Sequence, residues 1–365
     1  MKKHYISIFC MLLLCLAAML SGCSDSEPVK LVKSELSQIQ KLDEKTIRNF
    51  ISYEDIIHSG SASDIGSEAT EAVQLFFKNF SYRVLSSSAT EDSATVNVEI
   101  KNIDAQSLAR DLCLELIAMS SSPSTGAESM SSKSSYFSLL RDILSSHEYA
   151  LTKTTAHFHL TNEDGQWTIR SDETLEDQIV SGFISFLKDP DLVTPEEITV
   201  KVFENLRKQS PSDWVSYLGM HDIFSTYSTL YEKVDLALAT QISKCFSYRI
   251  QKVTEQTDAA EAVVEVTSLD MENVLDVYLK KLLDYASTTE AVRATDTELA
   301  DKTAALLSEC LNSNTKTCCK TIHIEFTNNG TTWKMQMNDD FTNALLGNMT
   351  EAVEKFQKEA LPATT

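Results

Sequence analysis

Glycine is scarce in this chain, with nine among 365 residues against an average near 7%. Few tight turns and much helix are therefore expected. The sequence also lacks G-x-G-x-x-G, a P-loop, G-x-S-x-G and H-E-x-x-H. No motif for a nucleotide cofactor, a serine hydrolase or a zinc protease is present, so we predict a protein that is not an enzyme and holds no cofactor.

Paired cysteines are also missing. Of the eight cysteines, five follow residue 23, an odd number with no C-x-x-C spacing, which indicates neither a disulfide framework nor a zinc site. Cys113 and Cys310 lie among apolar residues and are expected to be buried thiols. Cys318 and Cys319 are adjacent in a predicted strand, so one is expected in the core and the other exposed.

Basic residues are few, with 32 Lys and Arg against 53 Asp and Glu and a net charge of −21. Such a chain is expected to bind nucleic acid poorly, because binding requires Lys and Arg side chains that neutralise the phosphates. The charge also argues against a body that lies flat on anionic lipid. A hydrophobic content of 42% is ordinary for a globular protein.

The N-terminus carries Lys2 and Lys3 and then an apolar stretch over 6–20, shorter than the roughly 20 residues that span a bilayer comfortably. Small residues then lead to Cys23 in Leu-Ser-Gly-Cys, as in a cleavable signal. No second apolar stretch is long enough for a transmembrane helix. The alternatives are a retained membrane anchor and a plain secretory signal with a chance cysteine.

This N-terminus resembles that of bacterial lipoproteins. The resemblance implies that Cys23 receives a diacylglyceryl group and that the chain is cut before it, which would change the net charge to −23. Residues 1–22 would then be the signal peptide and 23–30 the lipidated cysteine with its tether. Two or more acyl chains, such as palmitate, make a stable anchor. The expected location is the extracytoplasmic face of the cell membrane.

An internal repeat dominates the rest of the chain. Phe-Ser-Tyr-Arg-Val at 80–84 returns as Phe-Ser-Tyr-Arg-Ile at 246–250, an offset of 166. The same offset relates His157, Thr161, Asn162 and Trp167 to His323, Thr327, Asn328 and Trp333. Two separate blocks with one offset indicate a tandem duplication, with predicted repeats at 31–189 and 190–362.

Each copy is predicted to run α-α-α-β-β-α-α-β-β-α, which is an α+β domain with a small antiparallel sheet. A Ser-rich loop is expected at 120–135, and Asn329-Gly330 favours a type I′ hairpin turn. In the first copy the predicted helices are 31–42, 46–57, 68–79, one from 104, 136–147 and one over 175–187, and the predicted strands are 80–85, 94–101, 154–160 and 167–170. In the second copy the predicted helices are 196–208, 213–218 and 223–245, followed by strands 246–253 and 260–267.

Alternation within the strands predicts which face is covered. Ala156, Phe158 and Leu160 are expected inside with His157 and His159 opposite, and Ile322, Ile324 and Phe326 inside with His323 and Glu325 opposite. This pattern resembles the cystatin-like and nuclear transport factor-like superfamily, and more specifically the tandem-domain lipoproteins of unknown function from anaerobic Gram-positive bacteria. The resemblance implies a curved sheet wrapped around a helix and no established reaction.

The polar residues shared by both copies are the candidates for a site, but each also has a structural interpretation. Arg83 with Glu99, and Arg249 with Glu265, are expected to pair across strands. Asp104 and Asp270 are expected to cap helices, and Trp167 and Trp333 to lie in the core. His157-x-His159 offers two imidazoles to a metal, but no third ligand is suggested, so we predict no metal site.

We therefore predict a membrane-anchored lipoprotein of the cell envelope that acts by binding, with a protein partner favoured. One alternative is a carrier of a small apolar ligand, which requires a cavity between the sheet and its helices. Another is an isomerase-like enzyme, which requires a buried acid on the covered face of a sheet.

Overall fold

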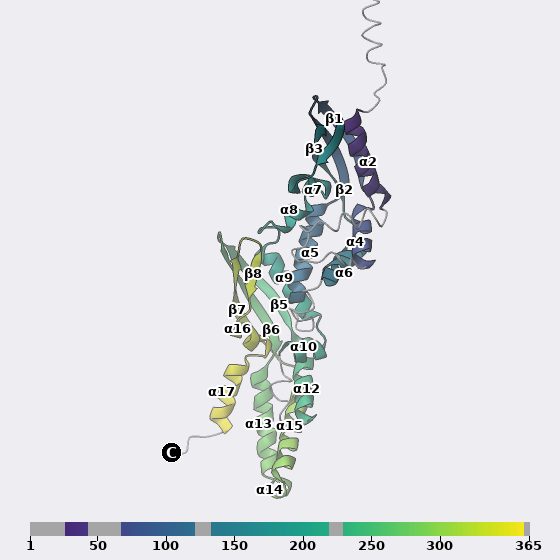
Figure 1. Ribbon diagram of the computed structural model, residues 1–365. Coiled ribbons are helices and arrows are strands. Elements are labelled where there is room, and N and C mark those ends of the chain that lie inside the picture. The colour runs from purple at the N-terminus through teal and green to yellow at the C-terminus, as the bar shows by residue number, and fades with distance from the viewer. Residues whose placement is uncertain (1–25, 43–66, 121–132, 219–228, 361–365) are drawn as a thin grey trace, which may run out of the picture. The chain divides into compact units, whose positions relative to one another are not determined.

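The computed structural model describes residues 26–42, 67–120, 133–218 and 229–360 and confirms the predicted α+β class. Two separate four-stranded antiparallel sheets, β1-β2-β3-β4 and β5-β6-β7-β8, are each accompanied by helices (Figure 1). The chain divides into unit 1, Met1–Leu108 with Phe137–Ser185, and unit 2, Ala109–Tyr136 with Phe186–Thr365. In the described part of the chain, no helix is both long and apolar enough to cross a membrane.

Where both copies are described, their elements follow the same order. The predicted signal peptide, Cys23, the helix at 46–57 and most of the Ser-rich loop lie outside the described residues. The first copy has α2 (Glu27–Lys41), α4 (Ser67–Phe77), β1 (Ser81–Ala89), β2 (Ser93–Ile103), α5 (Ala105–Ser120), α6 (Lys133–Ser146), β3 (Leu151–Glu163), β4 (Gln166–Arg170), α7 (Glu173–Ile179) and α8 (Phe183–Leu187). The second copy has α9 (Pro195–Arg207), α10 (Pro211–Tyr217), α12 (Thr229–Cys245), β5 (Ser247–Glu255), β6 (Ala259–Leu269), α13 (Met271–Ala286), α14 (Thr289–Arg293), α15 (Asp296–Ser313), β7 (Thr317–Asn328), β8 (Trp333–Gln336), α16 (Asp339–Leu345) and α17 (Met349–Ala360). Helices α10 and α14 of the second copy align with 45–51 and 123–127, which lie outside the described residues.

The duplication extends to irregular features of the backbone. Strands β1 and β2 begin and end 166 residues before β5 and β6. The pairing register shifts between Val84 and Ser86 in β1, and between Ile250 and Lys252 in β5. Each shift is a β-bulge, in which one extra residue bends the strand and increases its twist. The two sheets therefore share the position of a bulge that curves them, as well as their strand order.

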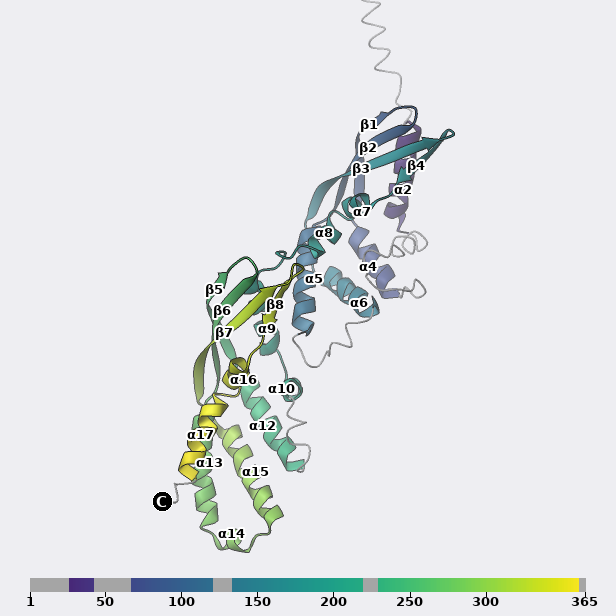
Figure 2. The same ribbon diagram turned by 60° about the vertical axis from the view of Figure 1, so that its left-hand side comes forward.

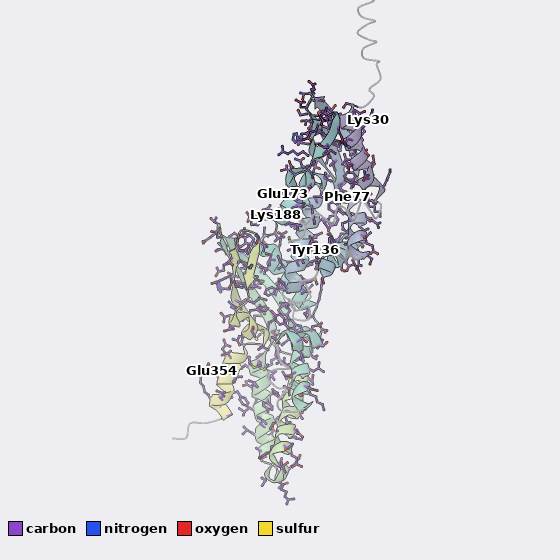
Figure 3. The ribbon with its side chains drawn as sticks, viewed as in Figure 1. Lys30, Phe77, Tyr136, Glu173, Lys188 and Glu354 are labelled. Carbon is purple, nitrogen blue, oxygen red and sulfur yellow. The ribbon has the colours of Figure 1, made fainter. Side chains whose placement is uncertain are left out.

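The covered face of each sheet follows the predicted alternation. Phe158 and Leu160 of β3 are buried, as are Ile324 and Phe326 of β7, while the residues between them are exposed. Helix α2 covers the first sheet with a stripe that includes the fully buried Val32 and Leu36, whereas Lys30 lies on its exposed side (Figure 3). Helix α9 has the same role in unit 2, through Ile198 and Val202. Each such side chain contributes about 1.5–3 kcal/mol on burial.

The last helix of each copy, expected as one piece, is two helices. Ser181 and Gly182 have φ of 59° and 84° between α7 and α8, and Gly347 and Asn348 have φ of 71° and 60° between α16 and α17. Two consecutive left-handed residues end a right-handed helix, because they turn the chain away from its axis. The apolar spacing continues across both breaks, so the periodicity predicted a single helix.

The predicted type I′ turn at Asn329-Gly330 is wrong. Asn329 N donates to Thr332 O (3.3 Å), so the two central residues are Gly330 and Thr331, and only Gly330 has a positive φ. Type I′ requires a positive φ at both central residues, so this turn is not of that type. Asn329 Oδ1 instead accepts from the backbone of Thr331 and Thr332 (both 3.1 Å). In the first copy, Asp164 and Gly165 both have positive φ, as type I′ requires.

Candidate functional site

The repeated Phe-Ser-Tyr-Arg motif joins the first helix of each copy to its sheet. Phe80 is buried, and Tyr82 Oη donates to Lys33 O of α2 (3.1 Å) and bonds Ser37 Oγ (2.9 Å). In unit 2, Tyr248 Oη donates to Glu204 Oε1 of α9 (3.1 Å), and burial raises the pKa of Tyr248 to about 12. The motif therefore has a structural use in both copies.

The arginine of the motif pairs with a glutamate on the open face of each sheet, the face that α2 or α9 does not cover. Arg83 lies opposite Glu99 in the register, with Nη2 3.3 Å from a carboxylate oxygen. Arg249 lies opposite Glu265 at 3.0 Å. Both cross-strand pairs are as predicted. Exposed pairs of this kind contribute little to the free energy of unfolding, because water screens the two charges.

Unit 1 adds a third charge to this pair. Lys153 Nζ of β3 lies 3.2 Å from Glu99 Oε1. The hydrogen bond from Lys153, followed by the charge of Arg83, holds the pKa of Glu99 below its usual value. In unit 2 the position equivalent to Lys153 holds Cys319, and the added neighbour of Glu265 is neutral, since Gln251 Nε2 donates to Glu265 Oε2 (3.3 Å). Lys153 gave no signal in the sequence, because its contact depends on the register between β2 and β3.

The two aspartates predicted as helix caps have that function. Asp104 Oδ1 accepts from Ser107 N (3.2 Å), and its Oδ2 accepts from Ser107 Oγ (2.8 Å). Asp270 Oδ1 accepts from Asn273 N at the start of α13 (3.0 Å). Each cap satisfies a backbone donor that the helix leaves open, which contributes about 1 kcal/mol.

The histidines lie on the open faces with partners from the neighbouring strand. His157 Nδ1 is 2.7 Å from Asn97 Oδ1, and His159 Nδ1 is 3.4 Å from Thr95 Oγ1. His323 Nδ1 is 2.8 Å from Glu261 Oε1. Within the described ranges, no group of three or more His, Cys, Asp or Glu side chains is placed to hold a metal ion. Each imidazole is used in a side-chain contact of its own sheet.

The cysteine pair and the tryptophans are placed largely as predicted. Cys318 is half-buried, with its Sγ 3.3 Å from Leu269 O, and burial raises its pKa to about 11. Cys319 is exposed and lies 3.3 Å from Thr267 Oγ1. Trp333 is buried and Trp167 is half-buried. Cys310 is buried as predicted, but Cys113, which lies on helix α5, is only half-buried.

A buried amide on β2 gave no signal in the sequence. Asn102 is fully buried, and neither Oδ1 nor Nδ2 has a hydrogen-bond partner. The equivalent residue in unit 2, Ser268, donates from Oγ to Leu345 O at 2.5 Å. Unpaired buried polar groups are costly, so Asn102 is a local weak point of unit 1.

Replacing Asn102 with leucine is expected to raise the free energy of unfolding of unit 1 by about 1–3 kcal/mol, because an unpaired amide is exchanged for an apolar side chain of similar size. Urea denaturation followed by circular dichroism measures the change. Ser268→Leu is the matched control and should destabilise unit 2, since it leaves Leu345 O without its donor. Equal effects at both positions would contradict this interpretation of Asn102.

Neither the protein-family models nor the curated proteins match the sequence. A solved structure of a candidate lipoprotein, ycdA, from Bacillus subtilis subsp. subtilis is similar at 13% identity, with 74% of this chain and 94% of that chain covered. The TM-score is 0.27, too low to establish a shared fold. The cystatin-like resemblance is therefore not confirmed, and the two-unit α+β architecture rests on this chain's own sheets.

Proposed function

We propose that this protein is a lipid-anchored, non-catalytic binding protein on the extracytoplasmic face of the cell membrane. The observation that supports the anchor is the short stretch of chain between Cys23 and the first described helix. Helix α2 begins at Glu27, four residues after Cys23. Four extended residues span at most about 14 Å. Acyl chains on Cys23 would therefore hold unit 1 close to the bilayer surface.

The use of the shared polar residues supports binding rather than catalysis. The repeated arginines and glutamates pair with each other, and the repeated aspartates cap helices. The interior of unit 2 contains ring contacts of Phe203 with Tyr248 and Phe341, with centroids 4.9 and 5.3 Å apart. Side chains that fill the space between helix and sheet leave the outer surface to contact other molecules. We therefore favour a protein partner over a small apolar ligand or an isomerase substrate.

Replacing Cys23 with serine is expected to abolish lipidation, because the thiol is the group that would be acylated. In a bacterial host fed an alkyne analogue of palmitate, the wild-type protein should take up the label, and the C23S variant should take up none. C23S should also keep residues 1–22, which mass spectrometry detects as a heavier chain. Cys319→Ser, which removes an exposed thiol of β7, is the control and should be labelled normally. A labelled C23S protein would refute the proposed anchor.

A further inference from the structure

The open faces of the two sheets have diverged in their apolar residues. Leu85, at the bulge of β1, and Leu151, at the start of β3, are 47% and 41% exposed. Within the described part of unit 1, they are the large apolar side chains with substantial exposure. The equivalent positions in unit 2 hold Gln251 and Thr317. Polar residues thus suffice at both positions of this fold, so neither leucine is required by the sheet itself.

The charges on these faces have diverged as well. Lys101 of β2 lies directly opposite Lys153 of β3. Like charges directly opposite each other destabilise a sheet. Lys153 reaches Glu99, which already pairs with Arg83, and Lys101 has no ion pair with any described residue. Unit 2 has Thr267 and Cys319 in place of the two lysines, which leaves Arg249 and Glu265 as a neutral pair. Unit 1 therefore has a repulsive pair of lysines that the fold does not need.

These residues form one continuous area, which we name the basic patch: Leu85, Arg83, Lys101, Lys153 and Leu151. Arg83 and Glu99 share one cross-strand row, Lys101 and Lys153 share the next row on that face, and Leu151 follows Lys153 on β3. The patch covers about 20 Å along the strands and about 10 Å across three of them. Helix α2 packs on the other face of these strands, and it lies behind them in Figure 2. Three cations, one anion and two exposed leucines are thus presented together on the open face of the sheet.

We propose that the basic patch docks an acidic protein segment that also carries apolar side chains. This inference rests on the proposed function and names the chemistry of its partner. Carboxylates of the partner would pair with Lys101 and Lys153 and relieve their repulsion, while its apolar side chains cover Leu85 and Leu151. Charge complementarity of this kind sets the specificity and association rate of an interface.

The position of the anchor favours a protein over the bilayer as the occupant. Gln40, near the end of α2, donates to Phe80 O, next to the end of β1 that carries the basic patch. Glu27 begins the helix, about 20 Å away along its axis. The tether to Cys23 therefore leaves from the opposite end of the sheet. At that end the hairpin tips carry Glu91, Asp92 and Asp164, which an anionic bilayer would repel.

The test uses the chain from Ser24 to Thr365, which contains every described helix and strand of both units. The probe is a fluorescent peptide of Glu, Leu and Thr, and its binding is measured by anisotropy. The test variant is Lys101→Thr with Lys153→Ser. The matched control is Lys252→Ser with Lys334→Thr, which removes two lysines from the open face of unit 2 and inserts the residues that unit 1 has there. Both variants have the same net charge, so only the position of the lost charges differs.

We expect the K101T/K153S variant to bind the peptide at least about fivefold more weakly than wild type, and the control variant to stay within about twofold. Raising the salt from about 50 to about 300 mM should weaken wild-type binding, because exposed charges are screened. A second variant, Leu85→Gln with Leu151→Thr, should also weaken binding while leaving the salt dependence unchanged. Circular dichroism confirms that each variant is folded.

Three results would overturn the proposal. Equal losses in K101T/K153S and in the control would mean that the peptide responds to net charge alone. Absence of wild-type binding at low salt would mean that the patch does not recognise acidic segments. Lysine-dependent binding to vesicles that contain anionic lipid, without peptide binding, would assign the patch to the membrane. All these measurements use unlipidated protein, so their failure is separate from that of the Cys23 labelling experiment.

Discussion

Replacing Gly347 with alanine is expected to lower the free energy of unfolding of unit 2 by about 2–5 kcal/mol. Gly347 has a φ of 71°, which costs an L-residue about 1–2 kcal/mol. A Cβ at this position would also lie 2.1 Å from Leu269 O, well inside van der Waals contact. The atoms that this Cβ would meet, in Leu269 and Met271, belong to the backbone, so the end of β6 or the α16–α17 junction must move. Urea denaturation followed by the fluorescence of Trp214 and Trp333 measures the loss.

Substitutions at two other glycines distinguish the cost of the clash from the cost of the left-handed backbone conformation. Gly330 and Gly165 have φ of 83° and 84°, and a Cβ at either position would meet nothing within 4 Å. Gly330→Ala should therefore cost only the roughly 1–2 kcal/mol of the left-handed conformation. Gly165→Ala should cost a similar amount in unit 1. If Gly347→Ala were no more harmful than Gly330→Ala, the close approach to Leu269 would not be a constraint on the fold.

Phe203→Ala is expected to destabilise unit 2 by about 3–5 kcal/mol. Phe203 is fully buried on α9, and its ring contacts Phe246, Tyr248 and Phe341. Phe246 directly precedes β5, Tyr248 lies in β5 and Phe341 lies on α16. The side chain of Phe203 therefore joins α9, β5 and α16. Its removal leaves a cavity that the ends of a sheet and two helices cannot easily close. The midpoint of thermal unfolding, followed by circular dichroism, should fall accordingly.

The same helix supplies a control for Phe203. Val200 is 41% exposed on α9, so Val200→Ala changes the helix without opening the core. Its effect should stay within about 0.5 kcal/mol, as for most surface substitutions. A large loss for Val200→Ala, or a small one for Phe203→Ala, would contradict the position of the core between α9 and the sheet.

Much of the fold could be predicted from the sequence because its signals are local or repeated. The alternation around Phe158 and Phe326 depends only on the geometry of a strand, and tertiary packing did not override it. The offset of 166 residues paired elements that no single stretch would have identified. The double break at Ser181 and Gly182 could not be predicted, because the apolar spacing continues through it. The turn at Gly330 was misassigned because Asn329 uses its side chain as an acceptor.

The contacts of the candidate site were predictable only within one hairpin. Arg83 and Glu99 could be paired because β1 and β2 are joined by a short turn. Lys153 and Leu151 belong to β3, and no local signal sets the register of β3 on β2. For the same reason, the net charge of the chain gave no indication of the basic patch. A total of −21 describes the whole surface, whereas binding depends on the few charges that the register brings together.

The shared bulges at Leu85 and Gln251 also bear on the history of the chain. An extra residue at the same point of two homologous strands is most simply inherited, so the bulge was present before the ancestral gene segment doubled. The left-handed pairs at Ser181-Gly182 and Gly347-Asn348 belong to the same inheritance. The second copy has different residues at the positions of Lys101, Lys153 and Leu151. The two copies therefore diverged at these positions after the doubling. The open face of the sheet is thus the surface on which the two descendants of an older domain have come to differ.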